Sequence, residues 1–173
     1  MWDFFATVRH RHSVRRYQAN RPVEEEKLHG ILEMACAAPS AGDRQAYHIV
    51  SVTDPALRSA LAAAADNQAF VAEAPVCLVF CTDPEQSAEE YGDRGRTLYA
   101  LQDTTIAATY AQLAAVAAGL GSAWVGFFSD ERVSEILGLE PRYHPVALLT
   151  IGYPAELPEP TPRRPMSERV STR

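Results

Sequence analysis

Hydrophobic and polar residues follow one another in short segments whose spacing predicts helices and strands in an irregular order. The clearest helix comes after Pro22, because apolar residues repeat there at the i, i+3, i+4, i+7 spacing of one helical face. This face consists of Leu28, Ile31, Leu32 and Ala35. Pro39 disfavours helical geometry at the residue before it, so the helix is expected to end near Ala38.

The other segments predict further helices and a small sheet. Helices are expected at residues 2–9, 55–65, 97–118 and 131–138, and strands at residues 47–53, 76–81, 122–128 and 144–154. Residues 76–81 (VCLVFC) are apolar at every position, which is typical of a strand buried on both faces. Residues 84–96 are polar and are expected to form a loop or a mobile helix. Because helices and strands do not alternate regularly, the order favours an α+β fold over a repeated βα architecture.

The length of 173 residues, 47% of them apolar, suits one domain with one sizeable core, so residues 1–173 are expected to form a single domain. Residues 154–173 are rich in proline and poor in large apolar side chains, and we expect them to form an extended tail that packs on a partner subunit. No apolar stretch is long enough for a membrane span, and the N-terminus has an acid at Asp3 and no apolar core long enough for a signal peptide. A cytoplasmic protein without a membrane partner is therefore expected.

Arginines are concentrated near both ends of a chain whose net charge is −6, a charge that argues against nucleic-acid binding. Residues 9–17 (RHRHSVRRY) hold four of them. If this segment is extended, Arg11, Ser13 and Arg15 share one face and could bind one anionic ligand. A solvated charged surface would explain the same residues.

Two further arginines, Arg163 and Arg164, lie between prolines in the tail. The prolines stiffen this segment, so the two guanidinium groups could be presented together to an anion, although a plain solvated tail would also carry such a pair.

The cysteines predict neither a disulfide nor a metal site. Cys77 and Cys81 would point to the same face of one strand, roughly 13 Å apart, whereas a disulfide needs Cα atoms within about 7 Å. With Cys36 they are interpreted as free thiols. No CxxC, GxGxxG, GxxxxGK[ST], GxSxG or HExxH motif is present, so the common nucleotide, hydrolase and metalloprotease signatures are missing.

The order and spacing of several segments resemble the nitroreductase family in its small single-domain form, across about residues 4–169. The segments are RHSVRRY at 11–17, PVEEEKLHGILEMACAAPSAGDRQAYH at 22–48, AP at 74–75, GLGSAWVGF at 119–127, LTIGYPAE at 149–156 and PRRP at 162–165. The resemblance implies a nitroreductase-like mixed sheet flanked by helices, in an intertwined homodimer with FMN at each of two subunit interfaces. It also implies a ping-pong cycle that passes a hydride from NAD(P)H through flavin N5 to a nitroaromatic, quinone or similar small acceptor, with no catalytic side chain.

Carried over by position, the resemblance assigns the arginines to the cofactor. Arg11 would pair with the FMN phosphate, Ser13 would contact the ribityl or pyrimidine side, and Arg15 would lie near the N1–C2=O edge, where a fixed cation stabilises the reduced flavin. His12 belongs to the same segment. Two residues of the tail, Arg163 and Arg164, would join Arg11 at the phosphate.

The remaining cofactor contacts implied by the resemblance come from three loops. The loop of Pro39, Ser40, Ala41 and Gly42, with Gln45, would approach the flavin from the second subunit. Asn67 and Gln68 would meet the pyrimidine edge, unless they form an ordinary polar loop. A backbone N–H of Val125 or Gly126 would face flavin N5, beside Trp124, for which a simple core position is the alternative.

The chain also departs from the family pattern. Asp43 stands where asparagine is usual, and Ala46-Tyr47 stand where Pro-Trp is common; Asp43 is expected to point away from the flavin or to pair with Arg44. Residues 84–100 are expected to shape the substrate pocket. Two alternatives stay open: the same flavin fold with another reaction, reductive dehalogenation or flavin fragmentation, and a flavin-binding module without turnover.

Overall fold

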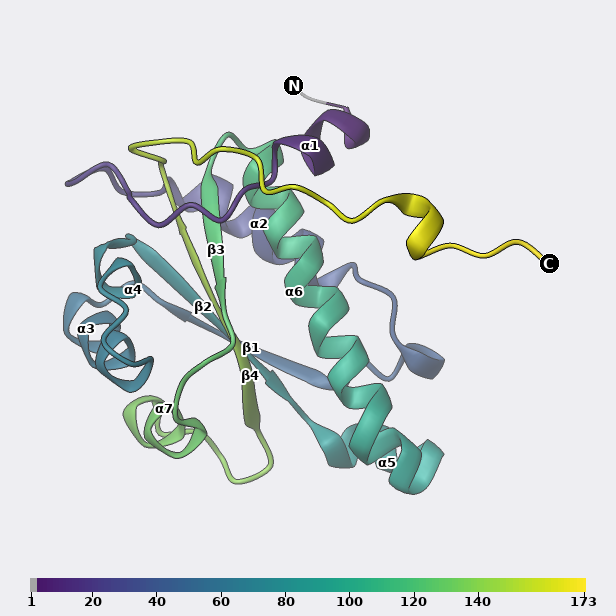
Figure 1. The fold of residues 1–173 in the computed structure, drawn as a ribbon. Coiled ribbons are helices and arrows are strands. Elements are labelled where there is room, and N and C mark those ends of the chain that lie inside the picture. The colour runs from purple at the N-terminus through teal and green to yellow at the C-terminus, as the bar shows by residue number, and fades with distance from the viewer. Residues whose placement is uncertain (1–2) are drawn as a thin grey trace.

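The computed structural model describes residues 3–173 and shows a four-stranded sheet with helices on both faces (Figure 1). The helices are α1 (Phe4–His10), α2 (Glu25–Cys36), α3 (Pro55–Ala64), α4 (Phe70–Glu73), α5 (Pro84–Arg94), α6 (Ala100–Ala117) and α7 (Asp130–Leu137). The strands are β1 (Tyr47–Val52), β2 (Val76–Thr82), β3 (Gly121–Val125) and β4 (His144–Gly152). Short 3₁₀ turns lie at Ala41–Asp43 and Met166–Glu168, and a π-helical turn at Gly95–Tyr99 joins α5 to α6.

The α+β class is confirmed, but the prediction of a mixed sheet is wrong for these four strands. Their order is β1-β2-β4-β3, and all three pairings are antiparallel. Within residues 3–173, a parallel pairing occurs only as an isolated bridge between Ser13 and Ser122. The pattern of apolar residues predicts strands but contains no direction of pairing, because direction depends on how distant segments meet.

Helix boundaries follow local capping chemistry closely. The Asp3 carboxylate accepts the Ala6 N–H at 2.7 Å and begins α1, while the predicted start at residue 2 lies outside the described residues. Ser129 begins α7, and Gly138 ends it in the left-handed conformation with φ of 60°. The polar segment at 84–96 forms the helix α5, which is one of the two alternatives predicted for it.

Strand β2 separates the two layers of the core, as its continuous apolar sequence predicts. Leu78 and Phe80 face α2 and α6, whereas Cys77 and Val79 face α3, α4 and α7. All seven residues of β2 are buried. In Figure 1, α2 and α6 accordingly lie on one side of the sheet and α3, α4 and α7 on the other.

Helix α6 meets the sheet through small side chains. Ala107, Ala108, Ala111 and Ala115 are fully buried in the layer that also holds Leu78 and Leu149. Methyl side chains let the helix axis come close to the strands, so the position of α6 is set tightly by packing.

The segment after α1 is fixed along the edge of the sheet. Val14 donates its N–H to Ser122 O at 2.9 Å, and the Tyr17 hydroxyl, which donates to Val14 O at 2.8 Å, lies 2.6 Å from Thr150 Oγ1. Gly121 makes this approach possible, because a Cβ there would lie 2.7 Å from Val14 Cγ2. The backbone of the arginine-rich segment is therefore held in place on both sides of Val14.

The tail remains exposed in this single chain. Every residue from 159 to 173 is exposed, and the apolar side chains of Leu157, Met166 and Val170 are 71%, 72% and 59% accessible. The tail leaves the body of the molecule toward its C-terminus (Figure 1). Its packing on a partner subunit stays a prediction. Among the helices of residues 3–173, none combines the length and the apolar character that a membrane crossing requires.

The three thiols are expected to differ sharply in reactivity. All are free, but burial raises the pKa of Cys77 and of Cys81 to about 12, whereas Cys36 is exposed. The thiolate is the reactive form, so at pH 8 a thiol reagent such as Ellman's should modify one cysteine per native chain and three after denaturation. Rapid modification of two or more thiols in the native protein would contradict this buried placement.

Candidate functional site

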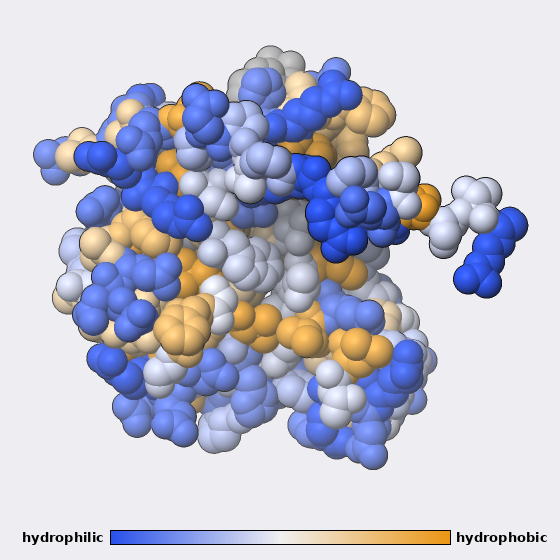
Figure 2. Space-filling view, viewed as in Figure 1, coloured by the Kyte–Doolittle hydropathy of each residue, from blue (hydrophilic) through white to orange (hydrophobic). Residues whose placement is uncertain are grey.

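The arginines from the two ends of the chain line one cavity. It has a volume of about 310 Å³ and is lined by Arg11, His12, Ser13 and Arg15 together with Pro158, Glu159, Thr161 and Arg163. In Figure 2, hydrophilic side chains gather where the tail crosses the segment after α1. The structure therefore brings together residues that are more than 140 positions apart in the sequence, which the sequence could only suggest from their composition.

The groups in this cavity suit an anion. The residues that line the cavity include three arginines and the hydroxyl-bearing Ser13 and Thr161. Glu159 is the single acidic residue among them. No carboxylate in the described part of the chain lies within 4.0 Å of the guanidinium groups of Arg11, Arg15 or Arg163. Their N–H donors are thus available to a ligand, and arginine forms paired hydrogen bonds with phosphate.

Alternation around the buried Val14 accounts for the outward direction of Ser13 and Arg15, although His12 lines the cavity as well. Val14 is 2% exposed and packs with Tyr17 and Ala74, so its neighbours Ser13 and Arg15 face outward. The Arg15 guanidinium also lies 5.8 Å from the centroid of the Phe70 ring. The prediction that Arg11, Ser13 and Arg15 share one face agrees with this arrangement.

Arg164 is not placed at this cavity. Its Nε lies 3.3 Å from Glu168 Oε2, and its carbonyl accepts a hydrogen bond from Arg169. Of the two adjacent arginines, Arg163 alone lines the cavity, while Arg164 is paired with Glu168.

The predicted loop residues line a second, separate cavity. Pro39, Ser40 and Ala41 form one wall of a space of about 680 Å³, and the start of α6 forms the other. The α6 wall and the turn before it contribute Tyr99, Leu101, Gln102, Asp103, Thr105 and Ile106. No residue lines both this cavity and the arginine cavity. Within one chain the predicted site is thus in two parts.

The loop itself has an unusual backbone. Positive φ values of 54°, 56° and 49° occur at Gly42, Asp43 and Gln45. Residues other than glycine rarely adopt this backbone conformation. The Ser40 hydroxyl accepts the Gln45 N–H at 2.9 Å, and the side-chain amide of Gln45 lies 3.1 Å from Asp43 Oδ1. Arg44 pairs with Glu89 of α5 instead of with Asp43.

Asp103 holds both ends of this loop and was not identified from the sequence. Its Oδ1 accepts the Ala41 N–H at 2.9 Å, and its Oδ2 accepts the Ala46 N–H at 3.4 Å. The residue is 2% exposed, and this burial raises the pKa of the carboxyl group. The signal that could have found it is a single acid in an otherwise apolar and threonine-rich helix, since a buried acid needs hydrogen-bond donors.

The other predicted residues lie around the end of β3. Gln68 donates to Ala65 O at 2.9 Å and lies 3.5 Å from Phe127 O, so it ties the turn that contains Asn67 to the residues after Gly126. Asn67 has a φ of 56°. Val125 is buried on the α3 side of the sheet, and Gly126 is exposed.

Trp124 is partly buried and packs against the core layer of α2 and α6, in agreement with the alternative of a core role. Ser122 of β3 forms a bridge with Ser13, which lines the arginine cavity. Trp124 and Val125 lie further along the same strand, and Gly126 follows its end.

Comparisons with known proteins agree with this geometry. The model of the nitroreductase family matches residues 8–68 and 62–153. A Thermus thermophilus protein named NADH dehydrogenase is 38% identical over 187 residues, which cover 92% of this chain and 90% of that one. The NADPH-flavin oxidoreductase of Vibrio harveyi is 34% identical over 166 residues, covering 92% and 69% of the two chains.

A solved structure leads to the same conclusion. The NADPH:FMN oxidoreductase of Vibrio harveyi in complex with NAD⁺ has a TM-score of 0.88 and 33% identity, covering 97% of this chain and 76% of that one. Both Vibrio harveyi comparisons are named NADPH-dependent flavin or FMN oxidoreductases, within the enzyme class expected from the sequence. The resemblance seen in the ordered sequence segments is confirmed, and this chain belongs to the nitroreductase family.

Proposed function

We propose that this protein is an FMN-dependent oxidoreductase that uses NAD(P)H to reduce a nitroaromatic, a quinone or a similar small acceptor. The observation that carries the proposal is the arginine cavity, in which three guanidinium groups from the two ends of the chain meet. In a member of the nitroreductase family, a phosphate dianion is the ligand that this donor set fits best.

The chain's own residues supply binding and electrostatics. Arg11 and Arg163 would hold the phosphate, and the Ser13 hydroxyl would meet the adjoining ribityl chain. Arg15, steadied by the Phe70 ring, would place its positive charge beside the flavin pyrimidine and favour the reduced state. Bound FMN would supply the redox chemistry, since it can take a hydride from NAD(P)H and deliver it to an acceptor.

A second subunit would complete the site. The Pro39–Ala41 wall and the arginine cavity have no residue in common, so one chain presents two separate half-sites. In a homodimer the loop of one subunit would cover the flavin held by the arginines of the other. The exposed tail, with its apolar Leu157, Met166 and Val170, would lie on that partner.

The test is a spectroscopic titration followed by turnover. The purified protein should bind FMN, lose the oxidised flavin absorbance when NADH or NADPH is added without oxygen, and regain it when menadione or nitrobenzene follows. Protein that ignores added FMN would contradict the proposal. Flavin that binds but is not reduced by either nicotinamide would instead indicate a binding module without turnover.

A further inference from the structure

We propose that Arg44 is a positioning residue for the cavity in which the acceptor binds, because it fastens a cap across the loop of the candidate site. The cap consists of residues 84–99, that is α5 and the π-helical turn that follows it. The inference rests on the proposed function, since it treats the cavity between Pro39–Ala41 and the start of α6 as the place where the acceptor binds.

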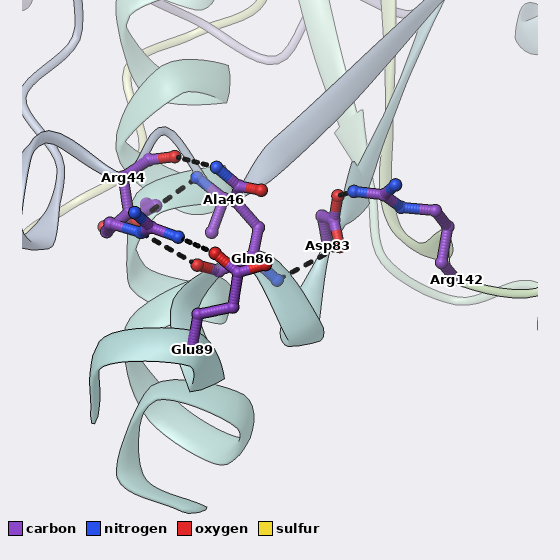
Figure 3. Close-up of polar contacts among 7 residues, drawn as sticks. Arg44, Ala46, Asp83, Gln86, Glu89 and Arg142 are labelled. Carbon is purple, nitrogen blue, oxygen red and sulfur yellow. Dashed lines mark hydrogen bonds and ion pairs between the residues drawn. The ribbon is translucent and has the colours of Figure 1, made fainter. Parts of the chain in front are cut away.

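Arg44 connects the loop to the cap through three polar contacts (Figure 3). Its Nε donates to Gln86 O at 3.0 Å, and its guanidinium group forms an ion pair with Glu89. In return the Gln86 side-chain amide donates to Arg44 O at 3.4 Å. The Arg44 side chain is 26% exposed, whereas that of Glu89 is 67% exposed, so Arg44 is largely covered while the ion pair stays partly open to solvent.

The loop also touches the cap at a position that requires glycine. The Tyr91 hydroxyl lies against Gly42, in the space that a Cβ at residue 42 would occupy. The loop and α5 therefore meet face to face at Gly42 and Arg44. Once Arg44 holds α5, the position of the Tyr91 ring is fixed as well.

Tyr91 also contacts a residue in the wall of the cavity. Its ring packs edge-on against Tyr99, with centroids 5.1 Å apart, and Arg94 Nε donates to the Tyr99 hydroxyl at 3.0 Å. Tyr99 lines the cavity opposite Pro39–Ala41. Arg44 thus ties together two walls of the same space, one directly and one through α5.

Few side chains of the cap are buried, so its position depends on polar contacts. Besides Arg44, these contacts include the Asp83 cap of α5 and the ion pairs of Arg96 with Glu85 and Asp93. Ser87 is the one buried residue of α5, and Gly92 interrupts the helix with φ of 55° and ψ of −139°. An exposed, interrupted helix with few buried contacts opens at low free-energy cost. External contacts such as those of Arg44 therefore decide how well the Tyr99 wall is kept in place.

The loop, in contrast, does not depend on the Arg44 side chain. Asp103 holds Ala41 and Ala46, and Ser40 holds Gln45, through backbone N–H groups. Removing the guanidinium group should consequently free the cap while the loop and the arginine cavity keep their shape.

The test compares R44A with R96A, a matched loss of an arginine whose ion pairs, with Glu85 and Asp93, lie wholly inside the cap. R44A should speed amide hydrogen exchange in residues 84–99 of the flavin-free protein. It should also raise KM for menadione about fivefold with kcat nearly unchanged, because contacts of this kind are worth about 1 kcal/mol. R44K, which keeps the charge beside Glu89 but loses the donor to Gln86 O, should lie in between.

The FMN dissociation constant of R44A should stay within about twofold of the unchanged protein, because the phosphate cavity is separate. Unchanged exchange in the cap of R44A would overturn the inference, as would an equal rise in KM for R96A. If the unchanged protein fails to bind FMN, the proposed function fails, while hydrogen exchange on the flavin-free protein still tests the Arg44 contacts by themselves.

Discussion

Replacing Arg11 by alanine is expected to weaken FMN binding about 30-fold, because a charged hydrogen-bond partner of the phosphate contributes about 2 kcal/mol. Arg11 lines the arginine cavity, whereas Arg9 lies on the exposed face of α1 and does not. R9A is therefore the matched control and should change the dissociation constant by less than about threefold, through long-range attraction alone.

Quenching of FMN fluorescence, titrated at two salt concentrations, measures both variants directly. The loss in R11A should persist at high salt, since a direct contact is screened less than diffuse attraction. Equal effects of R9A and R11A would mean that the arginine-rich segment acts only through its overall charge, and the phosphate assignment of Arg11 would then be wrong.

The second large effect is expected on the free energy of unfolding, when Gly152 is replaced by alanine. A Cβ at this position would lie 2.6 Å from Pro75 Cδ and 2.8 Å from Tyr17 Cδ1. Both neighbours are stiff and packed, so G152A should lower the free energy of unfolding by about 2 kcal/mol through overpacking. Gly30 in α2 is the matched control. Apart from its chain neighbours and the backbone of its own helix, nothing lies within 4 Å of its Cβ position, so G30A should raise the free energy of unfolding by about 1 kcal/mol through helix propensity.

Urea unfolding at equal protein concentrations gives both values. FMN affinity provides a second measurement, because Tyr17 and Val14 hold the segment that carries Arg11 and Arg15. G152A should therefore also bind FMN less tightly, whereas G30A should not. A G152A protein as stable as the original would show that Tyr17 and Pro75 can move apart without cost.

Local features were well predicted by the sequence. The continuous apolar segment 76–81 forms a strand buried on both faces, as predicted, and the helix predicted at residues 131–138 is found as α7. These predictions succeed because each depends on residues within a few positions of one another. The shared outward face of Arg11, Ser13 and Arg15 belongs to the same class, since it follows from alternation in an extended segment.

Features that depend on distant pairs could not be predicted. The antiparallel direction of the sheet, the support of the loop by Asp103 and the Arg44–Glu89 pair each join segments more than 20 residues apart. A single sequence shows that an acid or an arginine is present but not which partner it meets. The sequence singled out residues 43–47 as a departure from the family pattern, but their partners in α5 and α6 emerged only from the fold.

The alanine face of α6 bears on attempts to transfer this site to another protein. The same helix that packs on the sheet through Ala107, Ala108, Ala111 and Ala115 carries Asp103 and one wall of the second cavity. A larger side chain at any of these alanines would push the helix outward as a rigid body and draw Asp103 away from the Ala41 N–H. A designer who copied every residue that lines the two cavities, but set them on a helix with leucines facing the sheet, would reproduce the chemistry in the wrong place.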